Sequence, residues 1–224
     1  MRRTNAVLAV LVVSVAFGSM GCRKLVRKLS GKSDYGYGSS GSYGSSGYSS
    51  SGYGGSSGYG GSSSSSSGSL LGGGWQTYSP DGKFSVNMPG APKETTQQIP
   101  SAIGSIPQKQ AMSTRSSSAV YMVAYMDIPA NVPFDSKAAL DGARDAAIKS
   151  SGGQLVTERN IKVEGKHAGR AVTVNMQSPI KATLQSQMFM VGKRFYQLQV
   201  IVPSFALANE GTSPDIFFDS FKTL

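Results

Sequence analysis

Two residue types that carry much of protein chemistry occur once each in this chain of 224 residues: Cys22 is the only cysteine and His167 the only histidine. A thiolate is a nucleophile, and an imidazole can act as a general base or bind zinc. Because Cys22 stands alone, no intrachain disulfide can form. The surroundings of the two residues differ, and only those of Cys22 predict a chemical role.

An apolar segment lies shortly before Cys22. Arg2 and Arg3 begin the chain, and Ala6–Phe17 follows as an almost continuous apolar run. This run is too short to cross about 30 Å of hydrocarbon as a helix, so residues 1–21 are expected to be a signal peptide and not a membrane span.

Small residues at Gly18, Ser19 and Gly21 come directly before Cys22. This pattern resembles a bacterial lipobox, with Ser19 where an aliphatic residue is usual. The resemblance implies cleavage after Gly21 and acylation of Cys22, with palmitate-type chains that hold the protein to a membrane. The alternative is an ordinary secretory signal beside an incidental cysteine, but an exported protein with one leftover thiol needs a use for it.

Positive charge is concentrated beside the proposed anchor. The net charge is +10, yet from Trp75 onward 15 Lys and Arg face 11 Asp and Glu, a balance of only +4. Five basic residues close to Cys22 are expected to contact anionic lipid headgroups, at about 1 kcal/mol each, although a merely solvated stretch would have the same composition. They are Arg23, Lys24, Arg27, Lys28 and Lys32. No basic stripe interleaved with aromatics follows Trp75, so no nucleic-acid partner is expected.

Residues 33–74 consist almost entirely of Gly, Ser and Tyr. Such a segment has too little apolar surface to offset the entropy of ordering, which predicts a disordered linker with a root-mean-square span of roughly 35 Å. Tyr43, Tyr48, Tyr53 and Tyr59 recur every five or six residues. An adhesive arm is therefore the alternative to a plain tether.

Residues 75–224 are expected to form one α+β domain built around a single antiparallel sheet of seven or eight strands. Strands are predicted at 75–78, 84–88, 108–115, 119–128, 155–163, 169–175, 182–191 and 195–202, with turn residues such as Ser79-Pro80-Asp81-Gly82 between them. Both faces of 119–128 are apolar, which predicts a central strand covered on both sides.

Two helices are expected to cover this sheet. The first is capped by Asp135 or Ser136 and ends at Gly152-Gly153, with an apolar stripe of Leu140, Ala143, Ala147 and Ile148. The second is expected to be capped by Ser213, with Pro214 at its first position and Ile216, Phe217, Phe218 and Phe221 facing the core.

Three motifs carry a resemblance to a known family. They are W-x-x-Y-S-P-D-G-K-F-S-V-x-M-P-G-x-P at 75–92, V-G-K-R-F-Y-Q-L at 191–198 and F-F-D-S-F at 217–221. Together they resemble a group of uncharacterised bacterial lipoproteins with a PsbP-like α/β/α sandwich domain. The resemblance implies an assembly, chaperone or binding role, and it supplies no catalytic residue.

No convergent catalytic group is visible from residue 75 onward, so no enzyme, metal or cofactor is expected. His167 lies in a predicted turn, where solvent exposure is expected, and a hydrolase using it is only a third hypothesis. Asp127, Asp135, Asp141 and Asp145 could suggest a cation site, but basic neighbours favour a solvated face.

Two side-chain types follow the predicted strands closely. The methionines are expected to fill the core, with an adaptable apolar groove as the alternative. Gln185, Gln187, Gln197 and Gln199 are expected to form a polar ladder on one wet face of the last hairpin.

The sequence thus predicts a monomeric, lipid-anchored protein of the bacterial envelope, facing the periplasm or the cell surface. Its folded part is expected to bind a protein, peptide or lipid without catalysis. A structural or adhesive role of the tyrosine-rich arm is the alternative function.

Overall fold

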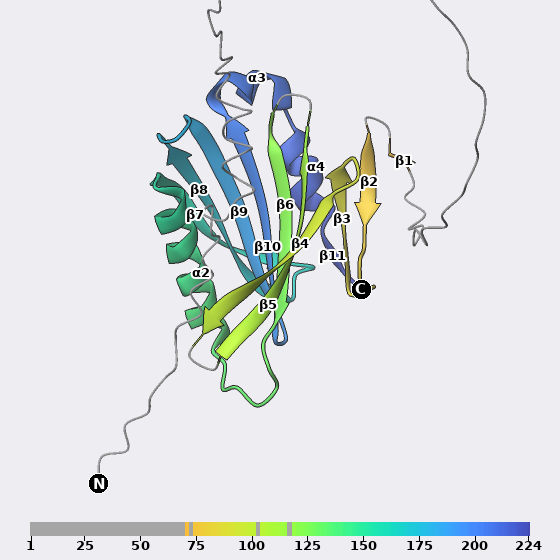
Figure 1. The fold of residues 1–224 in the computed structure, drawn as a ribbon, viewed down its shortest axis with the longest axis vertical. Helices are drawn as coiled ribbons and strands as arrows, with labels where there is room; N and C mark the ends of the chain where they lie inside the picture. Colours follow the sequence, from red (N-terminus) through yellow and green to blue (C-terminus); the bar gives the residue numbers. More distant parts are fainter. Residues whose placement is uncertain (1–69, 72–73, 102–103, 116–117) are drawn as a thin grey trace, which may run out of the picture.

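The computed structural model describes residues 70–71, 74–101, 104–115 and 118–224 (Figure 1). The predicted signal peptide and nearly all of the predicted linker lie outside the described residues. The same holds for Cys22 and for Arg23, Lys24, Arg27, Lys28 and Lys32.

The main sheet has seven strands, and all neighbouring strands are antiparallel. In spatial order they are β4 (Lys93–Ser101), β5 (Gly104–Thr114), β6 (Val120–Asp127), β10 (Arg194–Pro203), β9 (Ala182–Val191), β8 (His167–Met176) and β7 (Gln154–Val163). The sequence predicted six of these strands but not β4. The edge strand β4 is polar, and Ile99 is the one buried residue among Lys93–Pro100, so the strand lacks the apolar alternation by which a strand is recognised.

A second sheet of four strands packs separately: β1 (Leu70–Leu71), β2 (Trp75–Tyr78), β3 (Phe84–Pro89) and β11 (Lys222–Thr223), in the order β1-β2-β3-β11. The α+β class is confirmed, but the prediction of one sheet is wrong. Phe84, Val86 and Met88 of β3 alternate as fully buried residues, because this face of the small sheet covers the main sheet.

Helices lie on both faces of the main sheet (Figure 1). Helix α2 (Ser136–Ser151) packs on β8 and β9 and begins at Asp135, whose carboxylate accepts hydrogen bonds from the amides of Lys137 and Ala138. Gly152 ends it in the left-handed conformation, with φ 60°. Both predicted boundaries of this helix are confirmed.

The other face carries the small sheet and three short helices: η1 (Ser204–Ala206), α3 (Leu207–Glu210) and α4 (Ser213–Asp219). The predicted cap of α4 is wrong. Thr212 is the N-cap residue, and Ser213 is already helical, with its hydroxyl oxygen accepting a hydrogen bond from Arg115. Ile216, expected in the core, is exposed.

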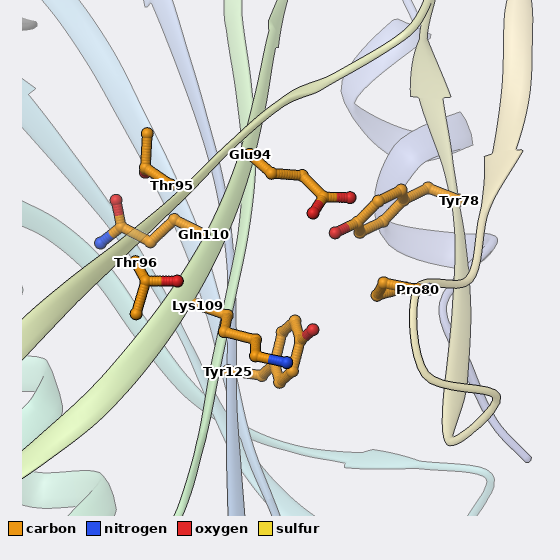
Figure 2. A pocket seen from close by; sticks show the side chains of 8 residues that line it. All are labelled: Tyr78, Pro80, Glu94, Thr95, Thr96, Lys109, Gln110 and Tyr125. Carbon is orange, nitrogen blue, oxygen red and sulfur yellow. The ribbon is translucent and has the colours of Figure 1, made fainter. Parts of the chain in front are cut away.

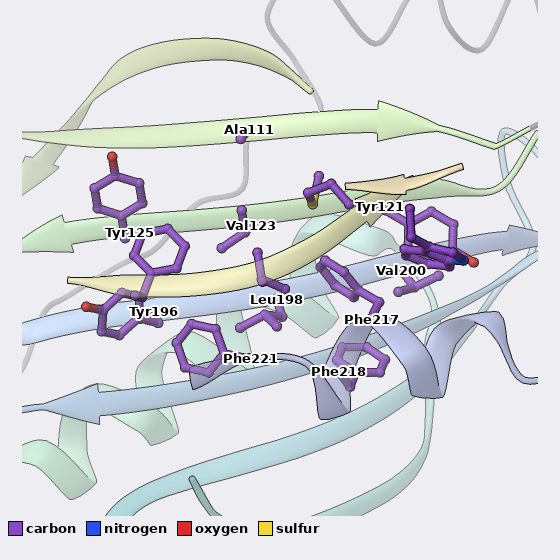
Figure 3. Close-up of a cluster of buried hydrophobic side chains, with 14 of the residues drawn as sticks. Ala111, Tyr121, Val123, Tyr125, Tyr196, Leu198, Val200, Phe217, Phe218 and Phe221 are labelled. Carbon is purple, nitrogen blue, oxygen red and sulfur yellow. The ribbon is translucent and has the colours of Figure 1, made fainter. Parts of the chain in front are cut away.

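The two larger cores lie on opposite faces of the main sheet. Strand β6 serves both: Tyr121, Val123 and Tyr125 belong to the aromatic core under the small sheet, and Met122 and Met126 belong to the core under α2. Figure 3 shows the aromatic core, in which Phe217, Phe218 and Phe221 pack over the sheet as predicted. Six methionines are buried and Met112 is partly buried, so core filling is confirmed. The six are Met88, Met122, Met126, Met176, Met188 and Met190.

The predicted ladder of four glutamines on one wet face is wrong. Gln197 pairs with Met188 and Gln199 with Ser186, so each odd-numbered residue of β10 lies opposite an even-numbered residue of β9. Gln185 and Gln187 therefore face the opposite side of the sheet from the glutamines of β10. Gln197 is 0% exposed and Gln199 is 2% exposed.

Candidate functional site

A polar cleft separates the β2–β3 turn from one half of the main sheet. Its cavity volume is about 290 Å³. Figure 2 shows Tyr78 and Pro80 on one side and residues of β4, β5 and β6 on the other. The lining residues are Tyr78, Pro80, Glu94, Thr95, Thr96, Lys109, Gln110 and Tyr125.

Strand register brings the lining residues of the sheet together. Thr96 of β4 lies opposite Lys109 of β5, and Lys109 lies opposite Tyr125 of β6. Alternate residues of a strand point to the same face, so these side chains form one row across three strands. The cleft therefore lies on the face that the small sheet covers only in part.

Tyr78 and Glu94 connect the two walls of the cleft. The Tyr78 hydroxyl faces the Glu94 carboxylate in Figure 2, and burial together with the charge and hydrogen bond of Glu94 raises the pKa of Tyr78. This phenol therefore stays protonated at neutral pH and is a hydrogen-bond donor at the mouth of the cleft.

Lys109 is the cation of the cleft. Its Nζ lies 5.9 Å from the centre of the Tyr125 ring, and its side chain is exposed. Burial raises the pKa of Tyr125 to about 12, with Asp81 adding to the rise. The floor of the cleft is thus an aromatic ring beside an accessible ammonium group, a pairing that adds cation–π attraction.

Arg194 holds in place the β2–β3 turn, which forms the side of the cleft that carries Tyr78 and Pro80. Its Nε and Nη2 donate to the two oxygens of Asp127, each over 2.6 Å, and its Nη1 donates to Asp81 in the β2–β3 turn. The guanidinium carbon also lies 5.2 Å from the centre of the Tyr125 ring. One buried cation therefore ties the turn to β6 and β10 and fixes the width of the cleft.

This arrangement can bind but carries no nucleophile activated by a base. On the face that the cleft occupies, the lining offers one ammonium group, one carboxylate, two phenols and one threonine hydroxyl, because Thr95 and Gln110 pair with each other and point to the opposite face. Such groups suit hydrogen bonding to an extended polar ligand. Sequence reasoning missed Glu94 and Lys109, because β4 was unrecognised and a lone lysine on β5 has no distinguishing neighbours.

The residues that suggested other chemistry are dispersed. His167 begins β8 and is partly buried, so its predicted exposure is only partial. Asp141 pairs with Lys137 over 2.8 Å and with Arg170, and Asp145 pairs with Arg144 over 2.8 Å.

Metal-binding clusters and membrane-spanning helices are both absent from the part of the chain that the structure describes. Within residues 70–71, 74–101, 104–115 and 118–224, no three His, Cys, Asp or Glu side chains gather as a metal site. In the same residues, no helix has the length and apolarity needed to span a membrane.

A second polar cluster lies at the other end of the small sheet. The Tyr121 hydroxyl donates to Glu210 Oε2 over 2.7 Å, and Arg115 Nη1 lies 3.7 Å from the same oxygen. Glu210 is 4% exposed, and its Oε1 has no hydrogen-bond partner among the described residues. Burial and Glu210 raise the pKa of Tyr121. This cluster holds α3 against β6 and against the residue that follows β5.

Comparisons with known proteins give weak structural likenesses. No family model and no curated protein matches the chain. The fold is similar to the solution structure of the cyanobacterial PsbP protein CyanoP from Synechocystis sp. PCC 6803, with a TM-score of 0.46 and 10% identity over 70% of this chain and 99% of that one. It is also similar to a Pseudomonas aeruginosa protein of unknown function, described as a putative regulator, with a TM-score of 0.36 and 12% identity over 64% of this chain and 92% of that one.

Proposed function

We propose that this protein is a lipid-anchored, non-catalytic binding protein of the bacterial envelope, whose cleft between Tyr78 and Lys109 takes an extended segment of a partner protein. The sequence around Cys22 supports the anchor, and the three motifs at 75–92, 191–198 and 217–221 support a PsbP-like domain. An assembly or chaperone-like role follows from these two parts together.

The observation that carries the binding role is the position of the cleft beside an open sheet edge. Strand β4 is the last strand of the main sheet, and no described strand pairs with its outer edge. Thr95 and Thr96 of this strand line the cleft. An unpaired edge presents backbone N–H and C=O groups to which an extended peptide can add as a further strand.

The cleft would supply selectivity to such pairing. A strand added at β4 places alternate side chains toward Tyr78 and Lys109, where a carboxylate or a carbonyl finds a donor. Glu94 would favour a cation at a neighbouring position of the partner. A segment of alternating charge therefore fits better than an apolar one.

Photo-crosslinking in the intact envelope tests the proposal. Thr95 is replaced by p-benzoylphenylalanine, and the matched control carries the same residue at Arg159 of β7, the opposite edge of the sheet. We expect a discrete crosslinked partner at position 95 only. Lys109→Glu should remove this product, whereas Lys162→Glu, an equal charge change on exposed β7, should not.

The outcomes separate the two parts of the proposal. Equal products at both positions would show that the cleft is not the binding site. A product at position 95 that neither Lys109→Glu nor Lys162→Glu changes would show the same. Mass spectrometry of the N-terminal peptide from the same preparation reports the acyl groups on Cys22. An unmodified cysteine would reject the anchor and leave the cleft to be judged on its own.

A further inference from the structure

Most large apolar side chains that the described residues expose lie toward one end of the main sheet. We call this the α3 end, because α3 lies there with the turn between β8 and β9 (Figure 1). Phe205 is 68% exposed, Val156 52%, Leu207 47% and Leu155 43%. These four residues are named the α3-end patch.

Register places the two halves of the patch at the same end. Leu155 of β7 lies opposite Val174, which lies opposite Leu184 of β9, and Leu184 lies opposite Ile201 near the end of β10. Phe205 and Leu207 follow directly after β10. A small buried core, formed by Val174, Met176, Ala182 and Leu184, lies between the two halves. The patch is therefore the exposed edge of a continuous apolar region.

The described chain also begins at the α3 end. The Trp75 ring packs edge-on against Tyr121 at 5.5 Å, and the Arg115 guanidinium lies 5.8 Å from the Trp75 ring centre. Arg115 and Tyr121 in turn contact Glu210 of α3. A tether that arrives at Trp75 from Cys22 therefore reaches the domain at the end that carries the patch.

Basic residues accompany the patch. Lys149 lies in the last turn of α2, directly before the loop into β7. The carbonyl oxygen of Lys181 accepts a hydrogen bond from the Ser204 amide over 2.9 Å, which places Lys181 beside the residue that precedes Phe205 in the chain. Both lysines are exposed. Asp215, in the first turn of α4, is an exposed acid at this end, and Glu210 is buried against Arg115. Two exposed lysines therefore stand against one exposed acid at this end, which leaves a positive balance.

We propose that the α3 end docks on the anionic surface of the bilayer that holds the lipid anchor. This inference rests on the proposed function, because the anchor brings the domain to the membrane. Apolar side chains flanked by lysines match the boundary between acyl chains and anionic headgroups. Docking at this end leaves the Tyr78–Lys109 cleft, which lies farther along the sheet, open to a partner.

Quenching by brominated lipids measures this docking in the acylated full-length protein. The chain is reconstituted into vesicles of phosphatidylethanolamine and phosphatidylglycerol, and Phe205→Trp is compared with Ala130→Trp. Ala130 lies at the opposite end, where its carbonyl accepts a hydrogen bond from Lys193 in the β9–β10 turn. Trp75 is the only native tryptophan and is 3% exposed, so it adds the same background to both variants.

We expect several-fold stronger quenching of Phe205→Trp than of Ala130→Trp, since docked side chains enter about 5–10 Å into the interface. The double change Lys149→Glu and Lys181→Glu should weaken quenching in anionic vesicles and leave it unchanged in neutral ones. Equal quenching at the two positions overturns docking. Docking is also overturned if the tryptophan of Phe205→Trp becomes shielded only when another protein is added. Failure of the chain to float with the vesicles rejects the anchor itself, whereas flotation without quenching rejects the docking alone.

Discussion

Arg194 and Asp127 form a bidentate ion pair across adjacent strands, with both hydrogen bonds at 2.6 Å. They are direct partners in the register of β10 and β6. The same guanidinium reaches Asp81, so the pair determines where the β2–β3 turn stands relative to the sheet. The width of the cleft is thus controlled by a residue that does not line it.

Replacing Asp127 by Asn should reduce the amount of unfolding free energy that the protein loses when the pH is lowered. The hydrogen bonds from Arg194 lower the pKa of Asp127 in the folded protein. The stabilisation is therefore fully present above the unfolded pKa of about 4 and is lost as the pH falls through the folded value. Because the Asp127 side chain is 61% exposed, the effect is screened and should stay below about 1 kcal/mol. Urea unfolding between pH 2 and pH 7 measures it, and parallel curves for Asp127→Asn and wild type would contradict the prediction.

A methyl group at Gly169 should destabilise the fold. A Cβ there would lie 2.6 Å from the Met188 carbonyl oxygen and would collide with the Phe189 ring, which stacks on Phe221 with centroids 5.5 Å apart. Gly169→Ala should cost about 1–3 kcal/mol, as overpacked core positions do. Denaturant unfolding followed by Trp75 fluorescence gives the value. Ala168→Ser, at the exposed neighbouring position, should change stability by less than about 0.5 kcal/mol.

Removing the hydroxyl of Tyr121 should leave the Glu210 carboxylate with too few partners. Glu210 Oε1 already lacks a hydrogen bond within the described structure, and Tyr121 supplies the 2.7 Å bond to Oε2. Tyr121→Phe should therefore cost about 1–3 kcal/mol of unfolding free energy. Tyr78→Phe is the matched control, because its partner Glu94 is exposed and water can replace the bond. A loss as large at Tyr78 as at Tyr121 would show that burial of the acceptor is unimportant.

The sequence predicted elements whose residues alternate or recur regularly. Strand β6 is the clearest case, since both of its faces are apolar and the structure buries both. Helix α2 was equally readable from Asp135, its apolar stripe and Gly152. In both elements the local pattern and the tertiary packing favour the same structure.

The errors arose where pairing across the sheet decides the outcome. Strand β4 exists because β5 offers it an edge, and its own residues are too polar to show this. The glutamines of β9 and β10 have the same spacing, yet the two-residue turn at Gly192 and Lys193 sets a register that sends them to opposite faces. The separate small sheet likewise depends on contacts far apart in sequence, such as Phe84 with Tyr196 at 5.3 Å. The cleft could not be predicted from the sequence for the same reason, because its walls come from both sheets.

Replacing the tyrosines of the arm tests whether it is a tether or an adhesive segment. A tyrosine-free Gly/Ser arm of equal length, which replaces Tyr35 and Tyr37 as well as Tyr43, Tyr48, Tyr53 and Tyr59, has nearly the same reach, because reach depends on length and stiffness. We therefore expect the crosslink at Thr95 and the quenching of Phe205→Trp to be retained. Shortening the arm to about ten residues should reduce its span to roughly 17 Å and weaken crosslinking of any partner that is held away from the membrane. Loss of the crosslink on removing the tyrosines alone, at constant length, would instead favour an adhesive arm that takes part in binding.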